Sequence, residues 1–157
     1  MNRPKPYSTE IITEAAKEYV KKLEHWNEDP DRLEESLIGA FNADLDTFAI
    51  AKRLDYDGFD IDEQKYNDLY EAYHIVNEIA KRVLKQWVID EGVKLELPIG
   101  TKITAKNLES PECEIVQVYP ETAEYGVWWE GYRVPKGKGH RIIKCEDIIS
   151  VFESNAL

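Results

Sequence analysis

The hydrophobic residues follow a helical period through the first part of the chain, from Ser8 to about Glu91. Apolar side chains recur there every three or four residues, the spacing that places them on one side of a helix. Ser8 is a favourable N-cap, and Asp29 followed by Pro30 marks a second helix start. These signals predict three helical stretches, and they leave open whether the second is broken at 42–44.

The third stretch has the most regular pattern in the chain. Its apolar residues are spaced alternately by three and four positions, which is a heptad pattern over three repeats. Additional apolar residues widen this stripe beyond the seam of a two-stranded coil, and Gly92 is well placed to end the helix. The pattern fits the central helix of a three-helix bundle or a homodimer interface, and both could hold. The heptad positions are Tyr66, Leu69, Tyr73, Val76, Ala80, Val83 and Trp87.

After Gly92 the hydrophobic period changes to two, which is typical of β-strands. Gly, Pro, Asn and Ser separate the short apolar runs, as antiparallel strands require. Five short strands have to close, or nearly close, to hide their edges. The order of a Gly-Thr strand, a long loop, two longer strands and a final Asp-Ile-Ile step resembles SH3-like small barrels of the Tudor and KOW type, over 97–152. The expected strands are 101–105, 113–118, 126–129, 141–144 and 148–151.

The two periods together predict an α+β protein in which a three-helix bundle precedes a small SH3-like antiparallel β-barrel. We expect no membrane span and no secretory signal, because no apolar run is long enough and none follows the basic start of the chain. Cys113 and Cys145 are then free thiols in the cytoplasm. The expected parts are a flexible N-terminus at 1–7, an acidic helical bundle at 8–91, the barrel at 93–153 and a tail at 154–157.

Acidic residues are concentrated in the helical part. The chain has 31 Asp and Glu against 20 Lys and Arg, a formal net charge of −11. Twelve of the acids lie within 28–63, where only three basic residues accompany them. This balance argues against direct binding to nucleic acid or anionic lipid, because Lys and Arg drive the binding of phosphates.

The acidic stretch suggests a binding function rather than catalysis. Acids at helix starts have a local explanation, but Asp44, Asp46, Asp55, Asp57 and Asp60 lack one at this level. We therefore expect a non-enzymatic protein-binding module that docks on a basic surface, as an inhibitor that mimics nucleic acid would dock on a nucleic-acid-handling enzyme of the kind that phages and mobile elements target. The candidate partner-binding residues are Asp44, Asp46, Asp55, Asp57, Asp60, Asp62, Glu63, Trp128, Trp129 and Tyr132.

A second interpretation places recognition in the barrel. Trp128 and Trp129 are adjacent on a strand, so one indole should be in the core and the other at the surface. The exposed indole and a basic loop could bind a peptide or a nucleic acid while the helices dimerise. An enzyme with an unrecognised, dispersed site is a third interpretation. The residues of the basic loop are Lys136, Lys138, His140 and Arg141.

Motifs for metal or catalytic chemistry are incomplete. The acidic segment 55–63 lacks both essential carboxylates of an EF-hand loop, which makes it an acidic turn before the third helix. Glu71 and His74 match half of a di-iron site, but no second copy is present. His140 and Cys145 are close in sequence without forming a nucleophile motif. We assign no metal, cofactor or catalytic residue.

Overall fold

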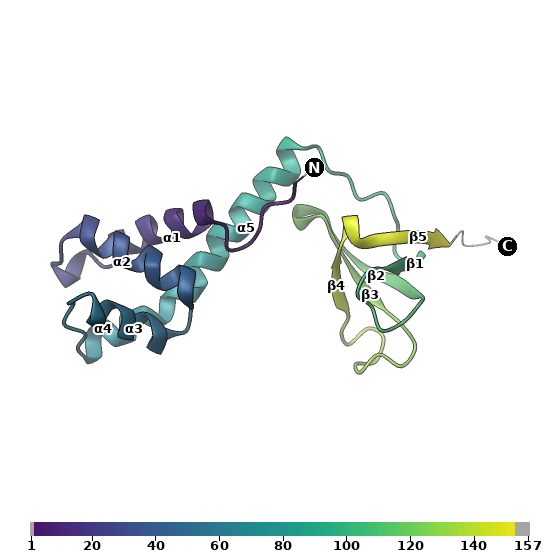
Figure 1. Cartoon of the computed structure of the whole chain (residues 1–157). Helices are drawn as coiled ribbons and strands as arrows, with labels where there is room; N and C mark the ends of the chain where they lie inside the picture. Colours follow the sequence, from purple (N-terminus) through teal and green to yellow (C-terminus); the bar gives the residue numbers. More distant parts are fainter. Residues whose placement is uncertain (1, 153–157) are drawn as a thin grey trace. The chain divides into compact units, whose positions relative to one another are not determined.

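A computed structural model describes residues 2–152 of the chain. The chain forms two compact units, a helical unit over 1–84 and a sheet unit over 85–157. Helices precede a five-stranded antiparallel sheet, which confirms the α+β class (Figure 1). The expected tail at 154–157 lies outside the described residues. None of the helices in the described part has the length and apolar character needed to cross a membrane.

The helical unit begins at the predicted N-cap. The Ser8 hydroxyl accepts a hydrogen bond from the Ile11 backbone N–H, and Asp29 caps the second helix with Pro30 at its first position. Short 3₁₀ turns lie at Glu24–Trp26 and Leu69–Glu71. The α-helices are α1 (Thr9–Lys22), α2 (Pro30–Ala43), α3 (Thr47–Tyr56), α4 (Glu63–Asp68) and α5 (Ala72–Asp90).

These helices do not form the expected three-helix bundle. The second stretch divides into α2 and α3, because Asp44 takes an extended conformation and the Asp46 side chain caps a new helix. The third stretch divides as well, because a 3₁₀ turn separates α4 from α5. The break left open at 42–44 is therefore real, and the third helix begins later than its apolar pattern predicted.

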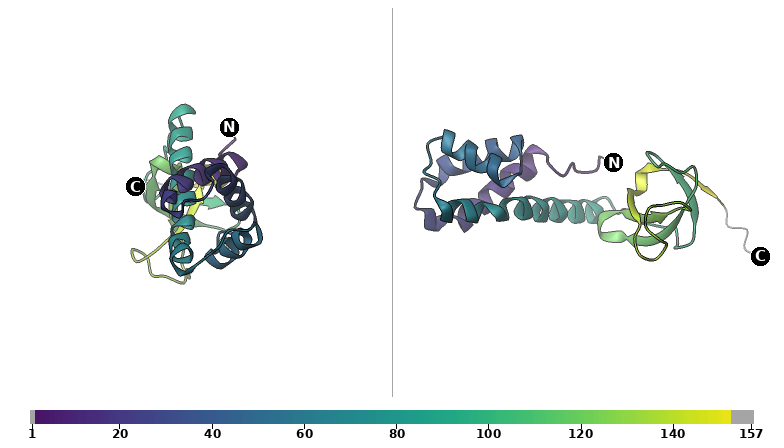
Figure 2. Two further views of the ribbon diagram at one scale, coloured as in Figure 1. Left: turned by 90° about the vertical axis from the view of Figure 1, so that its left-hand side faces the viewer. Right: turned by 90° about the horizontal axis from the view of Figure 1, so that it is seen from below.

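One hydrophobic core lies between the helices of this unit, which surround it when seen end-on (Figure 2). The rings of Tyr19 on α1 and Phe41 on α2 pack with centroids 6.1 Å apart. Ile50 and Leu54 of α3 are completely buried. Tyr73, which the heptad pattern places on the seam, is instead 50% exposed. The face that is buried has a helical period and comprises Leu69, Ala72, Ile75, Val76 and Ile79.

Asp68 joins the end of α4 to the segment that follows α1. Its Oδ2 accepts a hydrogen bond from Trp26 Nε1 at 2.8 Å and lies 2.7 Å from His25 Nε2. Gln64 Nε2 donates to Oδ1 at 3.2 Å, and the Tyr19 hydroxyl donates to the Asp68 carbonyl. Partial burial opposes ionisation, but the side-chain hydrogen bonds hold the pKa of Asp68 below its ordinary value.

Replacing Asp68 with alanine is expected to lower the free energy of unfolding of the helical unit by about 1–3 kcal/mol. The loss arises because Trp26 Nε1 is left without its acceptor in a largely buried position. Urea denaturation followed by far-ultraviolet circular dichroism measures this change. Asp60→Ala is the control, since that exposed side chain forms no hydrogen bond or ion pair in the described structure. Equal midpoints for the two variants would contradict the prediction.

The helical unit is also expected to lose stability in acid through this residue. A carboxyl group with a lowered folded-state pKa stabilises the fold above its unfolded pKa, about 3.9, and loses that contribution as the pH falls through the folded value. The difference in urea midpoint between the natural chain and Asp68→Asn should therefore be larger at about pH 7 than at about pH 3. A difference that does not shrink at the lower pH would disprove this assignment.

The sheet unit contains all five expected strands, each within about two residues of its predicted ends. The strand order is β4-β3-β2-β1-β5, and every neighbouring pair is antiparallel. Short 3₁₀ turns at Pro120–Thr122 and Cys145–Asp147 connect β2 to β3 and β4 to β5. The strands are β1 (Lys102–Ala105), β2 (Cys113–Tyr119), β3 (Glu124–Trp128), β4 (Arg141–Lys144) and β5 (Ile148–Phe152).

This sheet is open, contrary to the expected closure into a barrel. The turn after β4 leads β5 across to pair with β1, so β4 and β5 remain the two edges. Alternate residues face a separate core, in which Ile103, Ile115 and Val127 are completely buried. On the opposite face the register places Glu114 between Lys102 and Trp128 on its two neighbouring strands. These three residues form part of the lining of a pocket that is described below.

Candidate functional site

Two surfaces carry the residues that the sequence singled out, one in each unit. In the helical unit, Phe48, Lys52, Asp55 and Tyr56 lie at positions i, i+4, i+7 and i+8 of α3 and therefore share one helix face. This face points away from the core, since Phe48 is 65% exposed and Tyr56 is 85% exposed. We call these four residues, together with Asp60 in the following loop, the α3 surface.

Several of the candidate acids have structural roles that the sequence did not reveal. The Asp46 carboxylate accepts hydrogen bonds from the Phe48 and Ala49 N–H groups, and the Asp44 carboxylate accepts one from the Asp46 N–H. Asp62 caps α4 in the same way. The expectation that Asp44 and Asp46 lack a local explanation is therefore wrong, because they shape the turn into α3.

Asp57 is also engaged within the fold. Its carboxylate pairs with Arg53 Nε at 3.0 Å, and Arg32 of α2 donates to its backbone carbonyl. The Arg32 guanidinium also lies 4.5 Å from the centre of the buried Phe59 ring. Two arginines thus supply positive charge to the turn within 55–63, the segment that lacks the essential carboxylates of an EF-hand calcium loop. Asp55 and Asp60 are exposed and form no side-chain hydrogen bond or ion pair within the described part of the chain.

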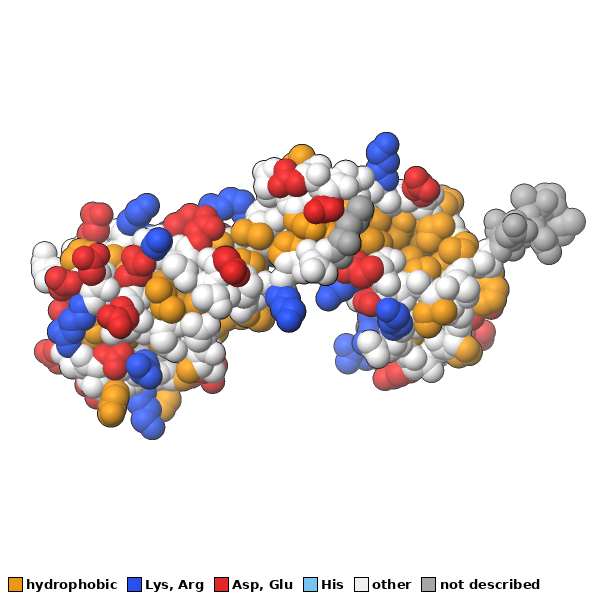
Figure 3. Space-filling view, turned by 45° about the horizontal axis from the view of Figure 1, so that its top comes forward, with side chains coloured by type: hydrophobic (Ala, Val, Ile, Leu, Met, Phe, Trp, Pro, Cys, Tyr) orange, Lys and Arg blue, Asp and Glu red, His pale blue; other side chains and the backbone are white. Residues whose placement is uncertain are grey.

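Glu63 stays exposed in the first turn of α4, where a negative charge is favourable. On the face shown in Figure 3, acidic side chains of the helical unit are interspersed with Lys and Arg and do not form a continuous acidic area. The acidic side chains on that face therefore occupy separate positions. The α3 surface combines two unpaired carboxylates, Asp55 and Asp60, with two exposed aromatic rings and one basic residue, Lys52.

The second surface surrounds two adjacent indoles in the sheet unit. Trp128 ends β3 and Trp129 follows it, and the two side chains occupy opposite environments, as predicted. Trp129 is buried in the sheet core. Trp128 is half-buried on the outer face, where its Nε1 donates to the Val134 carbonyl at 2.9 Å. The Lys136 ammonium lies 5.8 Å from the centre of the Trp128 ring.

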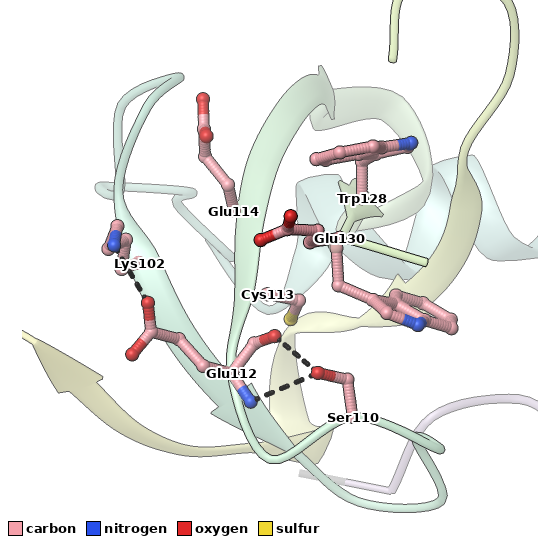
Figure 4. Close-up of a pocket in the computed structure, with 8 residues that line it drawn as sticks. Lys102, Ser110, Glu112, Cys113, Glu114, Trp128 and Glu130 are labelled. Carbon is pink, nitrogen blue, oxygen red and sulfur yellow. Dashed lines mark hydrogen bonds and ion pairs between the residues drawn. The ribbon is translucent and has the colours of Figure 1, made fainter. Parts of the chain in front are cut away.

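A pocket of about 340 Å³, here called the acidic pocket, opens beside these indoles (Figure 4). Three carboxylates line it, from Glu112, Glu114 and Glu130. Glu130 forms no ion pair among the described residues, and its carboxylate projects toward β2 beside Trp128. A carboxylate next to an aromatic face is an arrangement that attracts a cation.

Two lysines of the chain neutralise the other carboxylates of the acidic pocket. Lys102 Nζ lies 2.8 Å from Glu112, and this contact raises the pKa of Lys102. Lys136 Nζ lies 2.7 Å from both oxygens of Glu114. Glu130 is therefore the carboxylate that remains available to a ligand in this pocket.

A second pocket of about 340 Å³, here called the arginine pocket, shares Trp129 with the lining of the acidic pocket. Its lining includes the guanidinium-bearing residues Arg133 and Arg141, together with Glu109. The rings of Trp129 and Tyr132 stand 4.5 Å apart between centroids. Neither guanidinium group forms a hydrogen bond or ion pair in residues 2–152, so both are free to bind an anion.

The basic loop is less free than the sequence suggested. Lys136 is paired with Glu114, and His140 Nε2 lies 2.6 Å from the Tyr119 hydroxyl on β2. Lys138 is exposed, and Arg141 lines the arginine pocket. The four residues therefore do not act as one cationic loop, because two of them are held against the sheet.

Four residues of these two pockets were not predicted from the sequence as candidate binding residues: Glu109, Glu112, Glu130 and Arg133. A local signal for two of them exists in the run from Trp129 to Arg133. Gly131 has a φ of +87°, and the Tyr132 N–H donates to the Trp129 carbonyl at 3.0 Å, so the chain turns tightly there. The turn at Gly131, just after the buried indole of Trp129, places the charged residues Glu130 and Arg133 in pockets that Trp129 also lines.

The remaining chemical candidates are dispersed. His74 is exposed on α5, and within residues 2–152 no three His, Cys, Asp or Glu side chains are grouped so as to hold a metal ion. Cys113 donates to the Ile103 carbonyl at 3.5 Å, and burial raises the pKa of its thiol to about 11. A thiol with so high a pKa is a weak nucleophile at neutral pH.

A scan against protein-family models and searches of curated proteins and of solved structures found no match for this chain.

Proposed function

We propose that this chain is a non-enzymatic protein-binding module whose α3 surface docks on a basic surface of another protein. The observation that carries the proposal is the exposure of two aromatic rings, Phe48 at 65% and Tyr56 at 85%, on the helix face that bears the unpaired Asp55. Aromatic side chains of this kind supply much of the energy of protein interfaces when a partner covers them.

The charge of the α3 surface indicates the chemistry of the partner. Asp55 and Asp60 are free to meet Lys or Arg, while the capping residues Asp44 and Asp46 add negative charge at the other end of the helix. Carboxylates held on a rigid helix can take the place of phosphates in a basic groove. We therefore propose that the partner is a nucleic-acid-handling enzyme and that docking blocks its groove.

Competition with nucleic acid tests this function. A partner is first captured from cell extract on the immobilised full chain and then purified. Duplex DNA or RNA should displace the chain from that partner, because both occupy the same basic groove. The chain alone should give no shift of DNA or RNA in a gel at physiological salt. Simultaneous binding of nucleic acid and chain to the partner would reject the mimicry proposal.

A second candidate function belongs to the sheet unit. The two pockets that share Trp129 favour it, because they bring unpaired charged groups next to aromatic side chains. In this proposal the sheet unit recognises a peptide or a nucleic acid, and the helical unit dimerises along α5. Sedimentation analysis of the full chain tests the dimer, and binding measurements with the sheet-unit variants below test the recognition.

We also propose that the sheet unit is an SH3-like domain of the Tudor and KOW type in a cytoplasmic protein. The return of β5 to pair with β1 and the 3₁₀ turn before β5 support the SH3-like assignment. Cys113 and Cys145 are free thiols, which is consistent with a reducing compartment.

A further inference from the structure

Trp129 lines both the acidic pocket and the arginine pocket. Each has a volume of about 340 Å³, enough for one long side chain rather than for a large ligand. Their unpaired charges differ in sign, with Glu130 in the acidic pocket and, in the arginine pocket, Arg133 and Arg141 against the single carboxylate of Glu109. A ligand that filled both pockets would need one positive and one negative group close together.

This pattern favours a peptide over a nucleic acid. A nucleic-acid backbone carries a negative charge at every step, so a strand that reached the two arginines and passed Trp129 would bring several phosphates near the unpaired carboxylates of Glu109 and Glu130. A peptide can present a single negative group to the two arginines, which outnumber Glu109 in their pocket, and a positive group to Glu130. Trp129 and Tyr132, with ring centroids 4.5 Å apart, offer an apolar surface between the two charges.

We propose that the sheet unit binds a short peptide segment with a basic and an acidic side chain, one in each of the two pockets that share Trp129. The basic side chain enters the acidic pocket and pairs with Glu130. The acidic side chain, a carboxylate or a phosphoserine, enters the arginine pocket and pairs with Arg133 and Arg141. This inference depends on the second candidate function and names its ligand, and it is independent of the α3 surface.

A peptide array on the full chain tests the inference. Each end-blocked peptide carries one arginine and one aspartate separated by zero to three residues. Three further sets carry the arginine alone, the aspartate alone, or the arginine with phosphoserine in place of aspartate. Peptides with both charges should bind about fivefold more tightly than those with one, as expected when two ion pairs are formed instead of one. The phosphoserine set distinguishes the two sources of the negative group.

Matched variants connect that preference to the two pockets. Glu130→Gln should weaken binding of the best mixed-charge peptide about fivefold and leave binding of the aspartate-only peptides unchanged. Arg133→Gln should also weaken binding of the mixed-charge peptide about fivefold, but it should leave binding of the arginine-only peptides unchanged. Lys94→Gln and Glu96→Gln are the controls, because both side chains are exposed and line neither pocket. Thermal denaturation of every variant verifies that the fold is retained.

The possible results separate this inference from the function on which it depends. Peptide binding without a preference for mixed charge would overturn the inference and leave peptide recognition standing. Tighter binding of a single-stranded oligonucleotide through Arg133 and Arg141 would overturn the inference in favour of nucleic acid. Binding of no peptide and no oligonucleotide would overturn both the inference and the recognition function.

Discussion

Replacing Trp129 with alanine is expected to destabilise the sheet unit by about 3–5 kcal/mol, the usual cost of removing a large aromatic side chain from a core. Trp129 is buried against the sheet core and packs on the Tyr132 ring. A unit of this size has only a few kcal/mol of net stability, so the variant should be largely unfolded. Hydrogen exchange of the β2 and β3 amides measures this loss without interference from the helical unit.

Trp128 provides the matched control, because it is the same residue type at the next position. Its alanine variant should lose only about 1–2 kcal/mol, since the indole is half-buried and its main polar contact is one hydrogen bond to the Val134 carbonyl. Similar exchange rates in the two variants would contradict the assignment of one indole to the core and the other to the outer face.

Reversing the unpaired acids of the α3 surface is expected to reduce affinity for the captured partner by about tenfold or more. In Asp55→Lys with Asp60→Lys, two attractive contacts with a basic surface become repulsive. Both side chains are exposed and form no hydrogen bond or ion pair in the described structure, so stability should change by less than about 0.5 kcal/mol. Isothermal titration of the purified partner measures the affinity.

Glu24→Lys with Glu78→Lys changes the net charge of the chain by the same amount. Both residues are exposed in the helical unit, outside the α3 surface, and are unpaired within the described residues. This control should keep most of the affinity, because only the α3 surface is proposed to touch the partner. An equal loss in both double variants would attribute binding to overall charge and not to that surface. Reversal of Asp46 is unsuitable here, because it would remove the cap of α3.

Local chemistry was sufficient to predict much of the fold. Ser8 and the pair Asp29 and Pro30 start helices through contacts within three residues, and sequence spacing alone reveals such contacts. Strand alternation likewise predicted that Trp128 and Trp129 face opposite sides. These features depend on residues that are close in the chain, so they do not require knowledge of the tertiary structure.

Features that depend on distant residues were not predictable. Asp68 meets Trp26 across 42 positions of sequence, and no local pattern indicates that contact. The 3₁₀ turn at Leu69–Glu71 could not be predicted, because the apolar residues of the third helical stretch keep a helical spacing through it. Arg133 and Arg141 line one pocket only because the chain between β3 and β4 returns to the sheet, so their shared role was invisible in the sequence.

The helix caps also affect how a partner would first encounter this protein. The carboxylates of Asp29, Asp46 and Asp62 each accept hydrogen bonds from backbone N–H groups at a helix start, where the helix dipole supplies partial positive charge. These hydrogen bonds alter the field that an approaching partner meets close to each helix start, within about one turn. They leave the net charge of the chain at −11, which sets the long-range attraction that steers diffusional encounter with a basic surface. The association rate should therefore fall as the ionic strength rises.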